Sequence, residues 1–176
     1  PDQEDLYIIP AVSEEVGTIY DHCIRAIEHA LQFGEHGLPL MGTGDWNDGM
    51  NSVGDEGKGE SVWLGWFLYC VLKRFIPICD ARGDMEHVEK YSKIKDELIN
   101  SIETHAWDGG WYRRAYFDDG RPLGSQENDE CSIDSISQSW AVISGAARPG
   151  RISEAMLALE NHLIRRDEGL IQLLAP

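Results

Sequence analysis

The stretch ESVWLGWFLYCVLKRFI, residues Glu60–Ile76, carries apolar side chains all round a helical projection. A helix of that kind is normally enclosed by other helices, because a surface helix needs a polar face. The stretch therefore predicts the inner helix of a helical fold. Its longest uninterrupted apolar run, Val62–Leu72, stops at Lys73 and Arg74 and is by itself too short to span a bilayer, so we expect no insertion into a membrane.

Segments on both sides of this stretch have the spacing of amphipathic helices. Apolar residues recur every three or four positions in four segments, 13–34, 85–102, 134–146 and 152–163. Ser13 is the expected N-cap of the first helix. Between 107 and 124 the pattern instead alternates in twos and turns at 118–120, which predicts a β-hairpin. We therefore expect a mostly α-helical architecture with one small hairpin, such as part of a helical toroid.

The composition narrows the classes of partner. The 176 residues include 31 acidic and 15 basic ones, for a net charge of −16, and the basic residues are scattered. Such a chain is a poor partner for nucleic acid or for an anionic membrane surface. The four cysteines show no C-x-x-C spacing and no signal peptide opens the chain, so we expect a reduced, cytoplasmic setting. The length suits one domain or a piece of a larger one, and residues 1–10 read as the extended tail of an upstream segment.

A long loop, LMGTGDWNDGMNSVGDEG (Leu40–Gly57), precedes the inner helix. Loops of this length in compact domains usually have a function. Its polar residues fit an EF-hand calcium loop at positions one, three and twelve, but position six is Met50, where the sharp turn requires glycine. Asp and Asn also favour turns by bonding to the backbone, so a purely structural acidic turn remains an alternative.

The same loop has the composition of a catalytic acid site. A carboxyl group that donates a proton near neutral pH must be held protonated by apolar neighbours or by a second negative charge. Asp48 has Trp46 and Met50 two residues to either side and Asp45 three residues before it. These neighbours make Asp48 a candidate general acid, and the ring of Trp46 suits stacking on a sugar.

Other polar residues carry weaker signals. His22, His29 and His36 recur every seven residues, but no Asp or Cys partners them at ligand spacing, so we expect no metal site. Arg113 and Arg114 point to opposite faces of the expected strand. In this acidic chain, salt bridges are favoured for them over contacts with an anion or with substrate hydroxyls.

Four segments together resemble the catalytic region of glycoside hydrolase family ninety-four. They are GDWNDGMN, GKGESVWLGWFLY, WYRRAYFDDGRPLGS and DECSIDSISQSWAVISGAA, in the family's order and at similar intervals. The family includes cellobiose and chitobiose phosphorylases, and the last segment is most similar to its cyclic β-1,2-glucan synthase and β-1,2-oligoglucan phosphorylase branch. The resemblance implies an (α/α)6 barrel, of which residues 1–176 are a single fragment.

The resemblance also implies a reaction and roles for particular residues. In the family the second aspartate of the DWND motif is the general acid, which here is Asp48, while Asp45 supports the loop. The implied reaction is inverting phosphorolysis of a β-glucan, above all β-1,2-glucan, to α-glucose 1-phosphate, with inorganic phosphate as co-substrate and no cofactor. The sugar subsites implied by the resemblance include Asp45, Trp46, Asp129, Glu130 and Gln138.

Parts of the family pattern are not recognisable in this chain. The His- and Thr-containing segments that hold phosphate and the upstream segment that holds the sugar are missing, so we expect the rest of a larger polypeptide to supply them. The isolated chain is then inactive, and its exposed helix faces favour self-association. Two alternatives stay open: an inverting hydrolase, which needs a second carboxylate about 6.5–9.5 Å from the acid, and a non-catalytic glucan-binding module of a large synthase.

Overall fold

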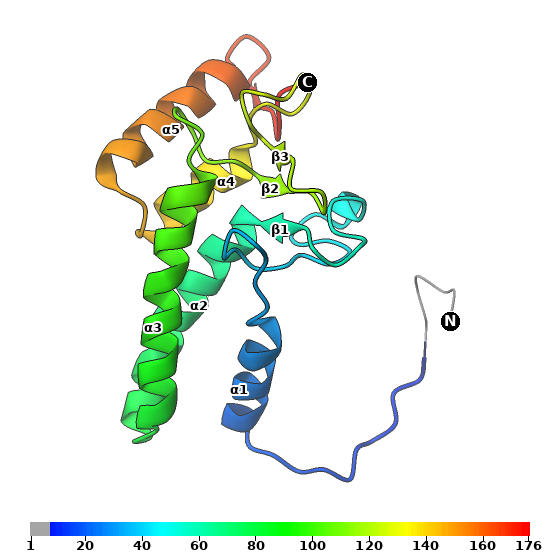
Figure 1. The fold of residues 1–176 in the computed structure, drawn as a ribbon, viewed down its shortest axis with the longest axis vertical. Coiled ribbons are helices and arrows are strands. Elements are labelled where there is room, and N and C mark those ends of the chain that lie inside the picture. Colours follow the sequence, from blue (N-terminus) through cyan, green and yellow to red (C-terminus); the bar gives the residue numbers. More distant parts are fainter. Residues whose placement is uncertain (1–7) are drawn as a thin grey trace. The chain divides into compact units, whose positions relative to one another are not determined.

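The computed structural model describes residues 8–176 (Figure 1). The chain divides into two compact units, 1–31 and 32–176. Most of the extended tail predicted for residues 1–10 lies outside the described part. Residues 8–10 belong to no helix or strand.

The described part of the first unit holds α1 (Ile19–Ala30). The hydroxyl of Thr18 accepts a hydrogen bond from the backbone N–H of Asp21 at 3.1 Å, and the Asp21 carboxylate accepts one from the Thr18 N–H at 2.8 Å. This reciprocal capping box fixes where the helix begins. The predicted helix is confirmed, but its predicted start is wrong, because the Ser13 hydroxyl closes a local turn by accepting from the N–H of Glu15 at 3.1 Å.

The second unit is built around a long apolar helix, α2 (Val62–Ala81). Its other long helices are α3 (Met85–Ser101), α4 (Ser135–Ser144) and α5 (Pro149–Leu163). α2 packs against α3 and α4, and α5 packs on α4; Figure 1 shows α2 and α3 running side by side. Trp66 and Leu72 of α2 have no exposed surface, and burying a side chain of this kind stabilises a fold by roughly 2 kcal/mol. The predicted helices are confirmed, and about half of the chain is helical. The enclosure predicted for the apolar helix is found only in part, because Phe67 and Ile78 of α2 are 41% and 49% exposed.

The length of α2 corrects one expectation. The helix continues past Lys73 and Arg74 to Ala81, so its 20 residues are long and apolar enough to cross a membrane by length and composition alone. The prediction that this segment is too short for a bilayer is therefore wrong. The core helix of a globular protein meets the same criterion, and α2 packs against two neighbouring helices here.

A small antiparallel sheet links the loop to the predicted hairpin. Its strands are β1 (Glu60–Ser61), β2 (Ala115–Tyr116) and β3 (Pro122–Leu123), in the order β1-β2-β3. β2 and β3 form the predicted hairpin, and the N–H of Gly120 closes its turn on the carbonyl of Phe117 at 2.9 Å. β1 follows the loop directly and pairs with β2, with Ser61 opposite Ala115. The hairpin is confirmed, and the sheet brings it against the loop.

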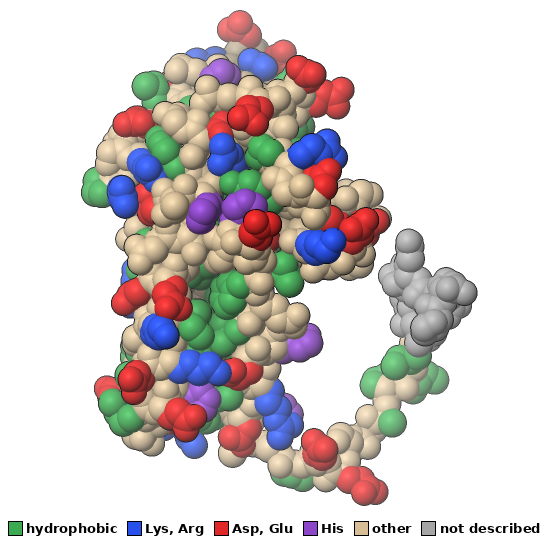
Figure 2. Space-filling view, viewed as in Figure 1, with side chains coloured by type: hydrophobic (Ala, Val, Ile, Leu, Met, Phe, Trp, Pro, Cys, Tyr) green, Lys and Arg blue, Asp and Glu red, His purple; other side chains and the backbone are tan. Residues whose placement is uncertain are grey.

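Three further short elements complete the described chain. They are the 3₁₀ turn η1 (Asp48–Met50), the π-helical turn η2 (Ile102–Ala106) and a two-stranded ribbon of β4 (Ile164–Arg165) and β5 (Leu170–Ile171). Figure 2 shows Lys and Arg side chains interspersed with Asp and Glu on the face of the second unit that it presents. This distribution is the scattered pattern expected from the sequence.

Candidate active site

The acidic loop is closed at its base by backbone contacts. The N–H of Met41 donates to the carbonyl of Gly59 at 2.9 Å, immediately before β1. Gly59 packs so closely on the returning loop that a Cβ at this position would lie 2.4 Å from the carbonyl oxygen of Val53. The loop therefore leaves and rejoins the sheet at neighbouring points, as compact surface loops do.

Asp45 is held at the centre of the loop by a bidentate ion pair. Arg114 Nη1 lies 2.6 Å from Asp45 Oδ2, and Arg114 Nη2 lies 2.7 Å from Oδ1. The hydroxyl of Ser61 donates to Oδ2 at 2.5 Å, and the N–H of Asn47 donates to Oδ1 at 3.1 Å. Burial opposes ionisation of this carboxyl, but the Arg114 guanidinium and the other hydrogen bonds together hold its pKa below the usual range. Asp45 is therefore ionised at neutral pH and has no proton to donate.

A second buried carboxylate lies on the other side of the same arginine. Asp134 is the N-cap of α4, and its Oδ1 accepts from the N–H of Ile136 at 2.7 Å. Its Oδ2 lies 3.5 Å from Arg114 Nε. Burial raises the pKa of Asp134 despite the nearby guanidinium. Arg114, which is 1% exposed, thus bridges the loop and the start of α4.

Asp48 is the first residue of η1, three positions after Asp45. The backbone on both sides of it is held by Asn47, whose Oδ1 accepts from the N–H of Gly49 at 2.9 Å and whose carbonyl accepts from the N–H of Met50 at 3.1 Å. The side chain of Asp48 lies outside what the structure describes. The backbone of Asp48 lies in a turn that Asn47 caps. The N–H of Asn47 in turn donates to the carboxylate of Asp45.

The tip of the hairpin holds the far end of the loop. Asp118 accepts three backbone hydrogen bonds, from the N–H groups of Glu56 at 2.9 Å, Lys58 at 2.7 Å and Gly59 at 2.8 Å. Its own N–H donates to the carbonyl of Val53 at 3.0 Å. Asp118 was expected only as a turn residue, because the turn motif carries no signal for a contact with a distant loop.

Three of the predicted sugar-contacting residues are exposed. Trp46 is 52% exposed on the acidic loop. Asp129 and Glu130 are exposed in the segment that leads into α4. That segment is ordered by Asn128, whose Oδ1 accepts from the N–H of Ser125 at 2.9 Å. These side chains are free to meet a ligand, and their subsite roles stay predictions.

Gln138, also predicted in a sugar subsite, is 0% exposed. Its Oε1 accepts from the N–H of Tyr112 at 2.8 Å, and its Nε2 donates to the carbonyls of Tyr112 at 2.7 Å and Asp134 at 2.9 Å. The amide is fully occupied by backbone groups and has no free polar atom on the surface. This geometry corrects the predicted contact: Gln138 joins α4 to the chain just before Arg114.

Both arginines of the hairpin form the salt bridges expected of them. Arg113 Nη2 lies 2.5 Å from Asp108 Oδ1, a different carboxylate from those that contact Arg114. Of the three histidines at seven-residue spacing, His36 places Nδ1 2.5 Å from Glu60 Oε2, and His22 and His29 lie on α1. Across residues 8–176, no group of three or more His, Cys, Asp or Glu side chains is arranged to hold a metal ion.

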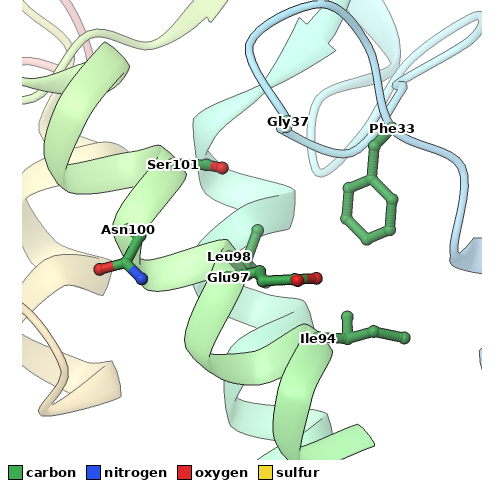
Figure 3. Close-up of a pocket in the computed structure, with 7 residues that line it drawn as sticks. All are labelled: Phe33, Gly37, Ile94, Glu97, Leu98, Asn100 and Ser101. Atoms are coloured by element: carbon green, nitrogen blue, oxygen red, sulfur yellow. The ribbon is translucent and has the colours of Figure 1, made fainter. Parts of the chain in front are cut away.

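A cavity of about 490 Å³ lies between the segment Phe33–Gly37 and α3 (Figure 3). Phe33, Ile94 and Leu98 form its apolar part, and Glu97 and Ser101 contribute polar groups. None of the predicted site residues lines it. The candidate active site is therefore the acidic loop on the hairpin and not this cavity.

Comparison with known proteins agrees with the family resemblance found in the sequence. The family model described as "Glycosyl hydrolase 94 superfamily, catalytic domain" matches residues 2–176. The cyclic beta-(1,2)-glucan synthase NdvB of Rhizobium meliloti is 46% identical over 175 residues, which are 99% of this chain and 6% of that protein. The 3-O-beta-D-glucopyranosyl-beta-D-glucuronide phosphorylase of Paenibacillus borealis is 37% identical over 150 residues, 85% of this chain and 20% of that protein.

A solved structure is similar in fold. The GH78 family rhamnosidase of Bacillus sp. GL1 matches with a TM-score of 0.59 and 20% identity, over 81% of this chain and 14% of that chain. At this identity the likeness concerns the fold alone. The chain spans only a fifth or less of the length of each of these three proteins.

Proposed function

The chain belongs to the glycosyl hydrolase 94 superfamily, and from this premise we propose that it carries the acid loop of an enzyme that cleaves β-glucosidic bonds by inverting phosphorolysis. Its curated relatives include named glycoside phosphorylases and a β-1,2-glucan synthase, which makes it part of a carbohydrate-active enzyme. The higher identity to the synthase favours β-1,2-glucan as the substrate. The helices of the second unit then form part of an (α/α)6 barrel, completed by the rest of a larger polypeptide.

The observation that carries this proposal is the ion pair that keeps Asp45 ionised. Asp45 is bound by Arg114 and Ser61 and stays ionised, so it cannot be the proton donor. Asp48 follows in the same loop on a separately capped turn. Of the two acids of the DWND motif, Asp48 is the one left to act as general acid.

The proposed reaction is a single displacement. Phosphate attacks the anomeric carbon from the face opposite the leaving group, and the bond from that carbon to the glycosidic oxygen breaks. Asp48 delivers its proton to the departing oxygen, which leaves as the hydroxyl of the shortened glucan, and the product is α-glucose 1-phosphate. Phosphate is already an anion, so no second carboxylate is needed to activate the nucleophile, unlike in an inverting hydrolase.

The exposed residues suit the acceptor side of such a site. The ring of Trp46 offers an apolar face on which a sugar can stack. The carboxylates of Asp129 and Glu130 are acceptors for sugar hydroxyls. We place inorganic phosphate, as co-substrate, on residues of the remaining polypeptide, and we expect the isolated chain to be inactive. No cofactor is required, and a cytoplasmic location is the setting we propose.

Product analysis of the complete protein tests this function. With β-1,2-gluco-oligosaccharide and inorganic phosphate it should form α-glucose 1-phosphate, detected by phosphorus NMR, and Asp48→Asn should abolish the product. Free glucose formed without phosphate would instead identify a hydrolase. Glucan binding measured by calorimetry in a protein without turnover would identify a non-catalytic module.

A further inference from the structure

We propose that Arg114 is a positioning residue that holds the Asp48 loop and the segment bearing Asp129 and Glu130 in one fixed relative geometry. The inference rests on the proposed role of Asp48 as general acid. Arg114 itself is only 1% exposed, so it acts through other residues and does not touch the sugar.

The guanidinium of Arg114 joins three separate segments. It forms the bidentate pair with Asp45 of the loop, lies 3.5 Å from the hydroxyl of Ser61 in β1, and lies 3.5 Å from the carboxylate of Asp134 at the start of α4. Its own backbone is fixed between strands, because its N–H donates to the carbonyl of Leu123 at 2.7 Å. A buried cation between two buried carboxylates is costly to move, since either acid would be left without its counter-ion.

Hydrogen bonds carry this constraint to the backbone around Asp48. Asp45 Oδ1, held by Arg114 Nη2, also accepts from the N–H of Asn47 at 3.1 Å. Asn47 in turn caps the turn through the N–H of Gly49 at 2.9 Å. The guanidinium is thus linked in three consecutive bonds to both neighbours of Asp48.

The second path runs through the start of α4. Asp134 lies only four residues after Glu130, and the intervening backbone is fixed. The N–H of Cys131 donates to the carbonyl of Ala175 at 3.2 Å, and the carbonyl of Ile133 accepts from the N–H of Ala175 at 3.0 Å. Cys131 has a φ of +53°, a left-handed conformation rare for a non-glycine residue, so the turn there is held by its surroundings. Asp129 and Glu130 are therefore attached to a backbone that Ala175 holds at Cys131 and Ile133 and that Arg114 holds at Asp134.

The rates of two glucosyl substrates distinguish a positioning role of Arg114 from a purely structural one. Phosphorolysis of a β-1,2-gluco-oligosaccharide needs a proton on the leaving oxygen, whereas dinitrophenyl β-glucoside has a leaving group stable as an anion. A displaced Asp48 slows the first reaction selectively, and a displacement of about 1 Å can reduce a rate about 100-fold. A smaller folded fraction would slow both reactions by the same factor.

The experiment uses the complete protein with Arg114→Lys, which keeps the charge and loses the bidentate geometry. We expect kcat for the oligosaccharide to fall about 100-fold. Its KM should rise as well, because the carboxylates proposed to contact the acceptor sugar are displaced with Asp134. The kcat for dinitrophenyl β-glucoside should fall less than about fivefold. Arg166→Lys is the control, because its ion pair with Glu160 joins two exposed side chains and includes neither the loop nor the segment that bears Asp129 and Glu130. It should leave both rates near those of the unmodified protein.

A second variant keeps the inference testable where Arg114→Lys fails to fold. Asp134→Asn preserves the helix cap and removes only the charge facing Arg114, and it should lower the oligosaccharide rate selectively by a smaller factor. Equal losses for both substrates, or no loss in either variant, would overturn the positioning role. If Asp48→Asn retains full activity, the proposed function fails instead, so the two failures are distinguishable.

Discussion

Replacing Gln138 by methionine should open the junction between α4 and the hairpin. Methionine has a similar length but no group that can bond to the backbone. The N–H and carbonyl of Tyr112 lose their partner, and both lie in a fully buried region. The carbonyl of Asp134 loses only one of its bonds, because an N-cap carbonyl already accepts the first bond of its helix.

The cost follows from these two unsatisfied groups. A buried donor or acceptor without a partner costs about 1–3 kcal/mol. Methionine has no polar amide to bury, and this saving offsets part of the cost of the two unsatisfied groups. We therefore expect the free energy of local opening around Tyr112 to fall by about 2–4 kcal/mol. At about 1.4 kcal/mol per tenfold change, the exchange rate of the Tyr112 amide should rise roughly 30- to 700-fold.

Hydrogen–deuterium exchange of the complete protein, resolved to single amides by fragmentation in the mass spectrometer, measures this rate directly. Gln126→Met is the control, since Gln126 is exposed and its side-chain amide donates to the carbonyl of Asp108, away from Tyr112. It should change exchange at Tyr112 by less than about tenfold. Unchanged exchange at Tyr112 in Gln138→Met would refute the reasoning, because it would mean that the amide of Gln138 does not protect this backbone.

Two further substitutions test the surroundings of Arg114. Asp45→Asn should lower the free energy of unfolding by about 3 kcal/mol at neutral pH, because it removes the bidentate partner of a buried arginine and leaves it the more distant carboxylate of Asp134. Burial alone would raise the pKa of Asp45, but Arg114 holds it below 3.8, so urea unfolding should show the full difference above pH 4 and a shrinking one as pH falls through the lowered pKa. Gly124→Ala would place a Cβ 2.6 Å from the backbone nitrogen of Arg114 at a φ of +77°, and should reduce both stability and phosphorolysis. Gly120→Ala, at a φ of +82° with nothing within 4 Å, should cost only the strain of about 1 kcal/mol and leave the rate unchanged.

The helices and the hairpin could be predicted because their signals are local. Buried residues recur every three or four positions in a helix and every two in a strand. The pattern of apolar residues within a short segment is therefore enough to predict the element. The same logic failed at the first helix, where Ser13 and Thr18 are both acceptable caps. The reciprocal bond with Asp21 decides between them.

The centre of the site could not be predicted in the same way. Asp45 and Arg114 are 69 residues apart, and no periodicity indicates which of the scattered cations reaches a given carboxylate. The loop motif indicates two candidate acids, Asp45 and Asp48. Only the ion pair with Arg114 shows that Asp45 is held in its ionised form. The position of Gln138 does indicate a buried role, because it lies on one face of α4 with Ala141 and Ser144, at steps of three, and that face is buried. A polar residue on a buried face bonds to the interior more often than to a ligand.

The central claim is that Asp48, and not Asp45, donates the proton. The most direct test measures phosphorolysis by Asp48→Asn in the complete protein with β-1,2-gluco-oligosaccharide and with dinitrophenyl β-glucoside. The account predicts that the oligosaccharide reaction is lost while the reaction of the activated glucoside persists, because its leaving group needs no proton. Equal loss of both reactions, or full activity on the oligosaccharide, would contradict it.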